Sequence, residues 1–391
     1  MALVVGNGTA QLLVAAMYVL TARSMHPDEF GSIVTVIALG VVGAGFADLG
    51  ANSYWIRELA SRRLTQDELN VRVWTRFLMV LAAAAGLAVT AFFVSPMFIF
   101  TGVFLVTTST VQTVLVPLRA AQRSESVGWL IVFGRAVAIA IFLVQTAAGV
   151  RPGLALLTSL PLGNLALVMC AYAVTSAPNR LGFCVRPWGN PWSGTKWFAV
   201  FTIGTSASKL DLPIVAALSG PGAAGIYGAV NRWTQPLAVA VAGFTSAAAP
   251  FVAAETRLVK LRAQLLRASW ILVLTIALCL GILATAPRLV TSLLGADFSD
   301  SAPVLQLLVM AVILNTFSQP LLVALQSRHF DHLTAVITAL TVVVQLSITV
   351  VLSPRLGALG AGIGMLVGQF VALLGAVSSI AVMARRRRSP S

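Results

Sequence analysis

The sequence predicts an all-α integral membrane protein with about 12 transmembrane helices. Three observations predict this class: a strongly apolar composition, long apolar runs from end to end, and an uneven distribution of basic residues between the loops. Of the 391 residues, 58% are hydrophobic and only 10% are charged, whereas soluble domains carry roughly 25% charged residues. A water-surrounded core could not bury so much apolar surface, so we expect this chain to be surrounded by lipid.

Each apolar run is long enough to cross about 30 Å of hydrocarbon as a helix. The runs cover residues 2–22, 30–50, 73–94, 96–117, 128–149, 153–174, 197–219, 223–250, 269–286, 302–325, 333–352 and 356–383. Because residues 1–22 lack the basic flank and cleavage site of a signal peptide, we expect them to form a retained first helix.

The Lys and Arg residues of the loops fall mostly on one side of these spans. One set of loops, with the C-terminal tail, carries Arg57, Arg62, Arg63, Arg72, Arg76, Arg119, Arg123, Arg180, Arg186, Lys196, Arg257, Lys260, Arg262, Arg267, Arg328 and Arg385 to Arg388. The opposite loops carry Arg23, Arg151, Arg288 and Arg355. Since cytoplasmic loops are the basic ones, we expect an even number of spans and both termini in the cytoplasm. The cytoplasmic segments 52–72 and 255–267 also have the one-sided apolar pattern of interfacial helices.

The longest loop, Ala177 to Lys196, divides the chain into two halves of six spans. The halves resemble each other, because Pro27 to Gly31 has a counterpart in Pro221 to Gly225, and the end of span four has a weaker one in span ten. Such internal duplication is a hallmark of transporters. We therefore predict a six-helix bundle at 1–178, a cytoplasmic inter-bundle loop at 179–196, a second six-helix bundle at 197–384 and a basic cytoplasmic tail at 385–391.

Several other functions are not supported by the sequence. The net charge of +14 is spread over many short loops, without the aromatic-lined basic groove of a nucleic-acid-binding protein. His329 and His332 flank Asp331, but no third group of ligands lies nearby, so we predict a solvated loop and no metal site. The three cysteines are expected to be small hydrophobic residues, not a disulfide framework.

Span twelve contains Gly360, Gly364 and Gly368, one helical turn apart. Because no strand precedes them, we interpret these glycines as a helix-packing ridge and not as a nucleotide-binding loop. No other nucleotide-binding loop is found, so we predict no cofactor and no hydrolysis of ATP by this chain.

Short motifs are spread over nearly the whole chain: Met25 to Gly31, Asp48 to Gly50 followed by Ile56 to Ala60, Lys209 to Asp211, Ala224 to Tyr227, and Leu294 to Phe298. Together they resemble the polysaccharide flippases of the multidrug, oligosaccharidyl-lipid and polysaccharide exporter superfamily. The resemblance implies two six-helix bundles around a central cavity. It also implies transfer of lipid-diphosphate-linked sugars from the cytoplasmic to the outer leaflet, and not catalysis.

Charged residues inside spans are functional candidates because each costs roughly 2.5 to 3.5 kcal/mol to insert. Lys209 in span seven and Arg232 in span eight are both four residues before a proline, Pro213 and Pro236. A proline cannot donate a hydrogen bond to the carbonyl four residues earlier, so we expect each helix to kink beside its cation and to border a polar cavity. We predict that both cations bind the diphosphate of a lipid-linked sugar; the alternative is that either one pairs with Asp211 or extends toward the membrane surface.

Six further residues complete the predicted substrate-binding set. Arg135 in span five and Asp211 in span seven are charged. Asp211 either neutralises Arg135 or Arg232, or binds a coupling proton or sodium ion. Asn7 and Gln11 in span one share a helix face, as do Asn315 and Gln319 in span ten. These four amides either line the cavity or form hydrogen bonds between helices.

The sequence therefore predicts a flippase for a polyprenyl-diphosphate-linked oligosaccharide, serving surface polysaccharide export by alternating access. It is expected in the cytoplasmic (inner) membrane as a monomer, in contact with membrane lipid and with polysaccharide biosynthesis enzymes. One alternative is an ion-coupled drug or cation antiporter of the same superfamily, which would favour acidic and aromatic cavity residues. The other is a membrane-embedded glycosyltransferase or polymerase, but the short external loops offer little room for a catalytic acid or base.

Overall fold

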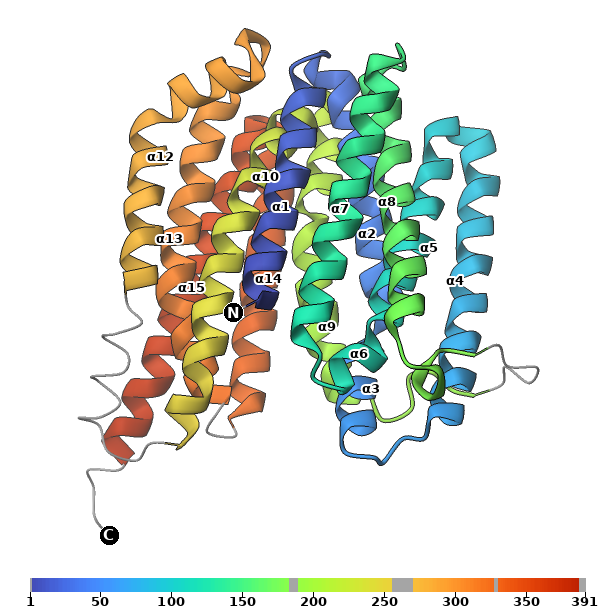
Figure 1. The fold of residues 1–391 in the computed structure, drawn as a ribbon. Helices are drawn as coiled ribbons and strands as arrows, with labels where there is room; N and C mark the ends of the chain where they lie inside the picture. Colours follow the sequence, from blue (N-terminus) through green and yellow to red (C-terminus); the bar gives the residue numbers. More distant parts are fainter. Residues whose placement is uncertain (1, 183–188, 255–269, 327–329, 387–391) are drawn as a thin grey trace. The chain divides into compact units, whose positions relative to one another are not determined.

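The computed structural model describes residues 2–182, 189–254, 270–326 and 330–386, and these residues form helices and connecting turns without a strand (Figure 1). Within these described ranges, eleven helical segments are long and apolar enough to cross a membrane. One of them, Phe198–Ala238, has 41 residues and covers most of predicted span seven and the first part of predicted span eight, with the non-helical Gly220 (φ 86°, ψ 169°) between them. The prediction of an all-α, multi-pass membrane protein is confirmed. The predicted segment 255–267, His329 and residues 387–391 of the basic tail lie outside the described residues.

Contacts divide the chain into two compact units, Met1–Pro213 and Ile214–Ser391, which are described separately here. The first unit contains the six helices predicted for the first bundle and, in addition, residues 197–213 of predicted span seven. The predicted division of the chain into two six-helix bundles, separated by the loop 179–196, stays a prediction.

The first unit is built from long helices joined by short ones. Its elements are α1 (Ala2–Ala22), α2 (Pro27–Asp48), α3 (Ala51–Ala60), α4 (Gln66–Val94), η1 (Pro96–Phe98), α5 (Ile99–Val114), α6 (Val116–Ala120), α7 (Ser124–Ala147), α8 (Pro152–Val174), η2 (Ala177–Asn179), α9 (Lys196–Ala207) and η3 (Ser208–Leu210). Helix α2 packs against α5 on one side and α9 on another, while α7 packs against both α1 and α8.

Small residues allow these helices to approach α2 closely. A Cβ atom on Gly40 would lie 2.4 Å from Cβ of Phe104 in α5, and one on Gly45 would lie 2.1 Å from Oγ of Ser206 in α9. Neither position has space for a side chain. The glycines of α2 therefore determine how closely α5 and α9 pack.

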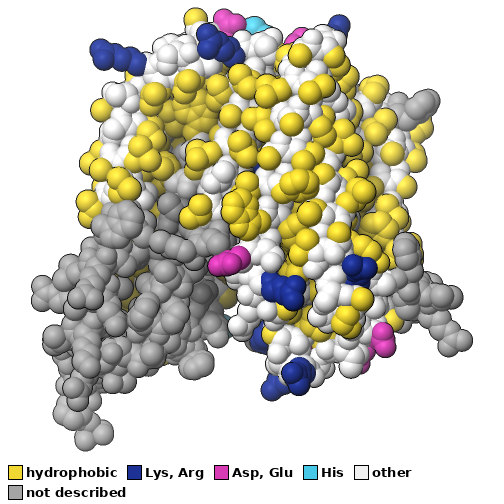
Figure 2. Space-filling view, viewed as in Figure 1, with side chains coloured by type: hydrophobic (Ala, Val, Ile, Leu, Met, Phe, Trp, Pro, Cys, Tyr) yellow, Lys and Arg dark blue, Asp and Glu magenta, His cyan; other side chains and the backbone are white. Residues whose placement is uncertain are grey.

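Within the first unit, predicted inner loops lie at one end and predicted outer loops at the other. At the inner end, α3 packs against α6 (Figure 1). At the outer end, a Cβ on Gly153 would lie 2.3 Å from Ile33 and 2.9 Å from Met25, so the turns before α2 and α8 are neighbours. Figure 2 shows hydrophobic side chains along the helices, with most Lys and Arg side chains near helix ends. This grouping is what the charge distribution of the loops predicts.

The second unit consists of the part of α10 (Asp211–Ala254) beyond Pro213, with α12 (Trp270–Leu294), η4 (Ala296–Phe298), α13 (Ser301–Gln326), α14 (Asp331–Leu356) and α15 (Ala358–Arg386). The turn at Gly220 is bonded to neighbouring helices of this unit. Ser219 Oγ donates to Ser353 O (2.6 Å), and Ser301 Oγ donates to Ile226 O (2.9 Å). These bonds place the start of predicted span eight beside the end of α14 and the start of α13.

Helices α14 and α15 pack along the predicted glycine ridge. A Cβ on Gly364 would lie 2.7 Å from Gln345 O, and one on Gly360 would lie 2.6 Å from Ser353 N. The facing side of α14 carries Thr341, Gln345, Thr349 and Ser353, all buried and four residues apart. The interpretation of these glycines as a packing ridge is confirmed.

Replacing Gly364 with Ala should destabilise the second unit by about 1 to 3 kcal/mol, because the new methyl group would collide with the backbone of α14. The measurement is the thermal midpoint of the purified protein in detergent. The control is Gly281→Ala, since a Cβ at Gly281 in α12 meets no atom within 4 Å. The control should be neutral or slightly stabilising. Equal midpoints for both variants would contradict the close packing.

Candidate functional site

Lys209 lies at an interruption in predicted span seven. Helix α9 ends at Ala207, residues Ser208–Leu210 form the 3-10 segment η3, and α10 begins at Asp211. Pro213 lacks the N–H that would bond to the carbonyl of Lys209 in a continuous α-helix. The predicted irregularity beside this cation is therefore present, and the exposed Lys209 side chain extends from it.

The backbone beside Arg232 is more regular than the backbone beside Lys209. Helix α10 has non-helical dihedral angles at Gly220, but it keeps helical dihedral angles past Pro236. Arg232 is half-buried on this helix within the second unit. The kink predicted beside both cations thus has a counterpart at Lys209, where the 3-10 segment η3 separates α9 from α10, whereas α10 stays helical at Pro236.

Asp211 is the first residue of α10 and is only 5% exposed. Its Oδ1 atom accepts a hydrogen bond from the backbone N of Leu212 (2.7 Å). The carboxylate thus lies at the start of a helix, where negative charge is favoured by the helix dipole. It is also two residues from Lys209 in sequence, directly after η3.

Arg135, Asn7 and Gln11 are brought onto two neighbouring helices of the first unit. Helices α1 and α7 touch at their glycines, since a Cβ on Gly6 would lie 2.8 Å from Gly128 O. Arg135 follows Gly128 by two helical turns and so lies on the side of α7 that faces α1. All three polar side chains are half-buried. Two amides and one guanidinium therefore lie along one pair of helices.

Asn315 and Gln319 are half-buried on α13 in the second unit. Pro320 lies inside this helix directly after Gln319. The proline removes the hydrogen bond to the carbonyl of Thr316, and the Thr316 hydroxyl donates to Val312 O (2.8 Å). The two amides thus lie beside a locally altered backbone in α13, as Lys209 does in predicted span seven.

A buried polar cluster in the first unit was not predicted. Arg76 of α4 is 2% exposed, and its Nη1 donates to Asp48 Oδ1 at 2.6 Å. Its Nη2 donates to Asn52 Oδ1 (2.9 Å) and to Thr113 Oγ1, and its guanidinium lies 4.5 Å from the centre of the Trp55 ring. These contacts join α2, α3, α4 and α5. We call Asp48, Asn52, Arg76 and Thr113 the corner cluster.

The sequence contains two signals for this cluster. Asp48 belongs to the Asp48-Leu49-Gly50 motif, and Arg76 lies inside the apolar run 73–94, so its assignment to the loop cations is wrong. An acid at the end of one span and a base inside the next are the usual partners of a buried ion pair. Arg76 therefore neutralises Asp48 inside the protein and is not a topology-determining loop residue.

The loop after α8 is bound to α4 by side-chain-to-backbone hydrogen bonds. Gln66 Nε2 donates to Asn179 O (3.3 Å) and Arg180 O (3.2 Å), and Asn70 Oδ1 accepts from Gly182 N (3.1 Å). Thr75 Oγ1 accepts from Gly189 N (3.3 Å). The described parts of this loop are therefore docked along one polar side of α4.

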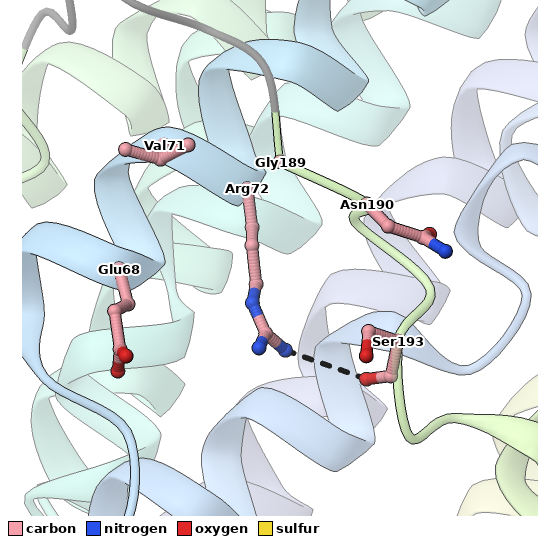
Figure 3. A pocket seen from close by; sticks show the side chains of 6 residues that line it. All are labelled: Glu68, Val71, Arg72, Gly189, Asn190 and Ser193. Carbon is pink, nitrogen blue, oxygen red and sulfur yellow. Dashed lines mark hydrogen bonds between the residues drawn. The ribbon is translucent and has the colours of Figure 1, made fainter.

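A small open cavity lies where α4 meets this loop, lined by Glu68, Val71, Arg72, Gly189, Asn190 and Ser193 (Figure 3). Its volume is about 290 Å³, and Arg72 crosses it to donate to Ser193 O at 3.4 Å. None of the predicted substrate-binding residues lines it. The cavity is thus a gap between helix and loop at the inner end of the first unit.

Comparisons with known proteins identify the fold. No protein family model and no curated protein sequence matches the chain. Solved structures do match. The lipid II flippase MurJ, in an inward closed conformation, has a TM-score of 0.73 at 12% identity, covering 97% of this chain and 87% of that one. An outward-facing multidrug resistance MATE family transporter of the MOP superfamily has a TM-score of 0.62 at 15% identity, covering 99% and 95%.

A third match is a MOP superfamily transporter from Pyrococcus furiosus, with a TM-score of 0.55 at 14% identity and 96% of both chains covered. That structure is described as having a binding pocket of reverse polarity that suggests a different function. At these identities the likeness establishes the fold alone. The chain has the all-α fold of the MOP superfamily transporters.

Proposed function

We propose that this chain is a flippase that moves a polyprenyl-diphosphate-linked oligosaccharide across the cytoplasmic membrane by alternating access. The fold supports a transporter, because its structural neighbours include a lipid II flippase and multidrug transporters captured in inward-facing and outward-facing conformations. The fold does not choose between an anionic lipid-linked substrate and a cationic drug. The charges inside the spans favour an anionic substrate.

The observation that carries the proposal is the excess of cations in the interior of the described spans. Apart from the corner cluster, whose Arg76 and Asp48 balance each other, the charges well inside these spans are Arg135, Lys209, Arg232 and Asp211. Three cations thus accompany one carboxylate. Placing a cation deep in the membrane costs free energy, and charge-assisted hydrogen bonds to a diphosphate headgroup would offset that free energy.

The MATE neighbours favour a drug or cation antiporter as the second candidate. A cationic drug would be repelled by the same three side chains, whereas a lipid diphosphate would be attracted. The description of the Pyrococcus furiosus structure likewise connects the polarity of the pocket with a difference in function. We therefore propose an anionic amphiphile as the substrate, with its headgroup at the cations and its lipid tail in the bilayer.

The proposed cellular setting follows from the basic loops. The chain is proposed to span the inner membrane with both termini in the cytoplasm, since basic loops stay on the cytoplasmic side. Biosynthesis enzymes on that side supply the lipid-linked sugar, and export enzymes use it on the other. The chain itself is proposed to act as a monomer and to catalyse no covalent change.

The test is transport by the purified protein in vesicles. A fluorescent polyprenyl-diphosphate-linked sugar should become accessible to an external quencher faster than in protein-free vesicles, and a cationic dye should not accumulate. The assay is run without a gradient, with a proton gradient and with a sodium gradient, to identify the coupling ion. Dye transport without movement of the lipid-linked sugar would replace the flippase with the antiporter.

A further inference from the structure

The chain turns sharply between α2 and α3, and the corner cluster holds this turn. Leu49 (φ 44°) and Gly50 (φ 73°) are consecutive residues in the left-handed region, where backbone conformations are costly for residues other than glycine. Asp48 Oδ1 accepts from the backbone N of Asn52 (3.1 Å) across the turn. The same oxygen accepts from Arg76, so α4 is fixed to the corner through one carboxylate.

The same corner contacts the start of α9. A Cβ on Gly50 would lie 2.4 Å from the backbone carbon of Phe198, so the two backbones touch. Arg57 of α3 lies over the Phe198 ring, 4.8 Å from its centre. Just before α9, Trp192 Nε1 donates to Ala47 O at 3.2 Å. Three contacts thus fix the inner end of α9 to the α2–α3 corner.

The other end of α9 is held against α2 where Gly45 meets Ser206. Lys209 follows three residues later, in η3, which also packs against α2. The depth and rotation of α9 therefore set where the Lys209 ammonium lies. A shift of one residue along α9 would move it by about 1.5 Å and rotate it by about 100°.

We propose that Arg76 and Asp48 are positioning residues for Lys209: their buried ion pair fixes the α2–α3 corner, and the corner fixes α9. The proposal rests on the proposed role of Lys209 in binding the headgroup, but the anchoring of α9 can be measured without any substrate. A buried ion pair suits this task because it is directional, whereas apolar contacts at the same place would permit rotation of the helices.

The test compares Arg76→Gln and Asp48→Asn with the double variant Asp48→Asn/Arg76→Gln. Each single variant leaves one charge buried without its partner, whereas the double variant replaces the ion pair with two neutral amides of similar shape. The control is Asp28→Asn, because Asp28 pairs with His26 at the surface, where 62% of its side chain is exposed. If Arg76→Gln does not fold, Arg76→Lys keeps the charge but loses the forked hydrogen bonds.

The first measurement is amide hydrogen exchange in detergent, without substrate. Residues 198–207 should exchange at least tenfold faster in the single variants than in the wild type, and near the wild-type rate in the double variant and in Asp28→Asn. Exchange in α14 and α15 should not change, because these helices belong to the second unit. Unchanged exchange in α9, or equal acceleration in both units, would overturn the positioning role.

The second measurement is transport per folded molecule. The single variants should need about a tenfold higher concentration of fluorescent lipid-linked sugar for half-maximal transport, and the double variant should recover. If the half-saturating concentration is unchanged although α9 exchanges faster, the corner does not position Lys209 for binding, and the proposal is overturned. Absence of any flipping by the wild type would instead refute the proposed function, while the exchange experiment still decides whether the cluster anchors α9.

Discussion

Replacing Lys209 or Arg232 with Gln should reduce transport of the lipid-linked sugar by about 100-fold while leaving membrane insertion intact. Each variant loses the charge-assisted hydrogen bonds to the diphosphate, which are worth about 1.5 to 3 kcal/mol. That range corresponds to roughly a 10- to 150-fold loss, since 1.4 kcal/mol is a factor of ten. The measurement is the initial rate of flipping in vesicles that contain equal amounts of folded protein.

The matched control is Arg288→Gln, because Arg288 is an exposed cation in the predicted outer end of α12. It should transport at the wild-type rate, which would show that a deep position, and not merely a positive charge, is required. Normal transport by both Lys209→Gln and Arg232→Gln would contradict the cationic site. An equal loss in all three variants would indicate a general effect of net charge instead.

The second large effect is expected from Gly50→Ala at the α2–α3 corner. Alanine is strained at the φ of 73° found there, and its Cβ would lie 2.4 Å from the backbone carbon of Phe198. Backbone strain costs about 1 to 2 kcal/mol, and overpacking against a rigid neighbour adds about 1 to 3 kcal/mol. The expected total loss of stability is therefore about 2 to 5 kcal/mol, measured by thermal or denaturant unfolding in detergent micelles.

Gly86→Ala in α4 is the control for this variant, because a Cβ at Gly86 meets nothing within 4 Å and the residue is helical. Its stability should be unchanged or should rise by up to about 1 kcal/mol. If Gly50→Ala were as stable as Gly86→Ala, the close contact between the corner and α9 would not exist in the folded protein.

The helices could be predicted from the sequence because hydrocarbon imposes a simple length requirement on every span. The grouping of inner and outer loops followed from Lys and Arg, which need no tertiary information. The irregular segment at Lys209 was also predictable, because Pro213 acts locally on the carbonyl four residues earlier, although the same spacing before Pro236 leaves α10 helical. In each case the physical cause lies within one helix or one loop.

The corner cluster could not be predicted in the same way, because its members come from four helices. Arg76 lies within the apolar run 73–94, but nothing local shows that its partner is Asp48, 28 residues earlier. The docking of the loop onto α4 was unpredictable for the same reason, since Gln66 bonds to backbone atoms of residues more than 100 positions away in sequence. Pairings of this kind depend on how helices pack, which hydrophobic periodicity alone does not specify.

The glycine ridge has a mechanical consequence for the second unit. Because backbone meets backbone at Gly360 and Gly364, neither lipid nor water can enter between α14 and α15 without separating the pair over several turns. Separation would also expose the Gln345 amide, which is 4% exposed in the folded protein, to hydrocarbon. Any rearrangement that opens the second unit is therefore expected to move α14 and α15 together, as one rigid pair of helices.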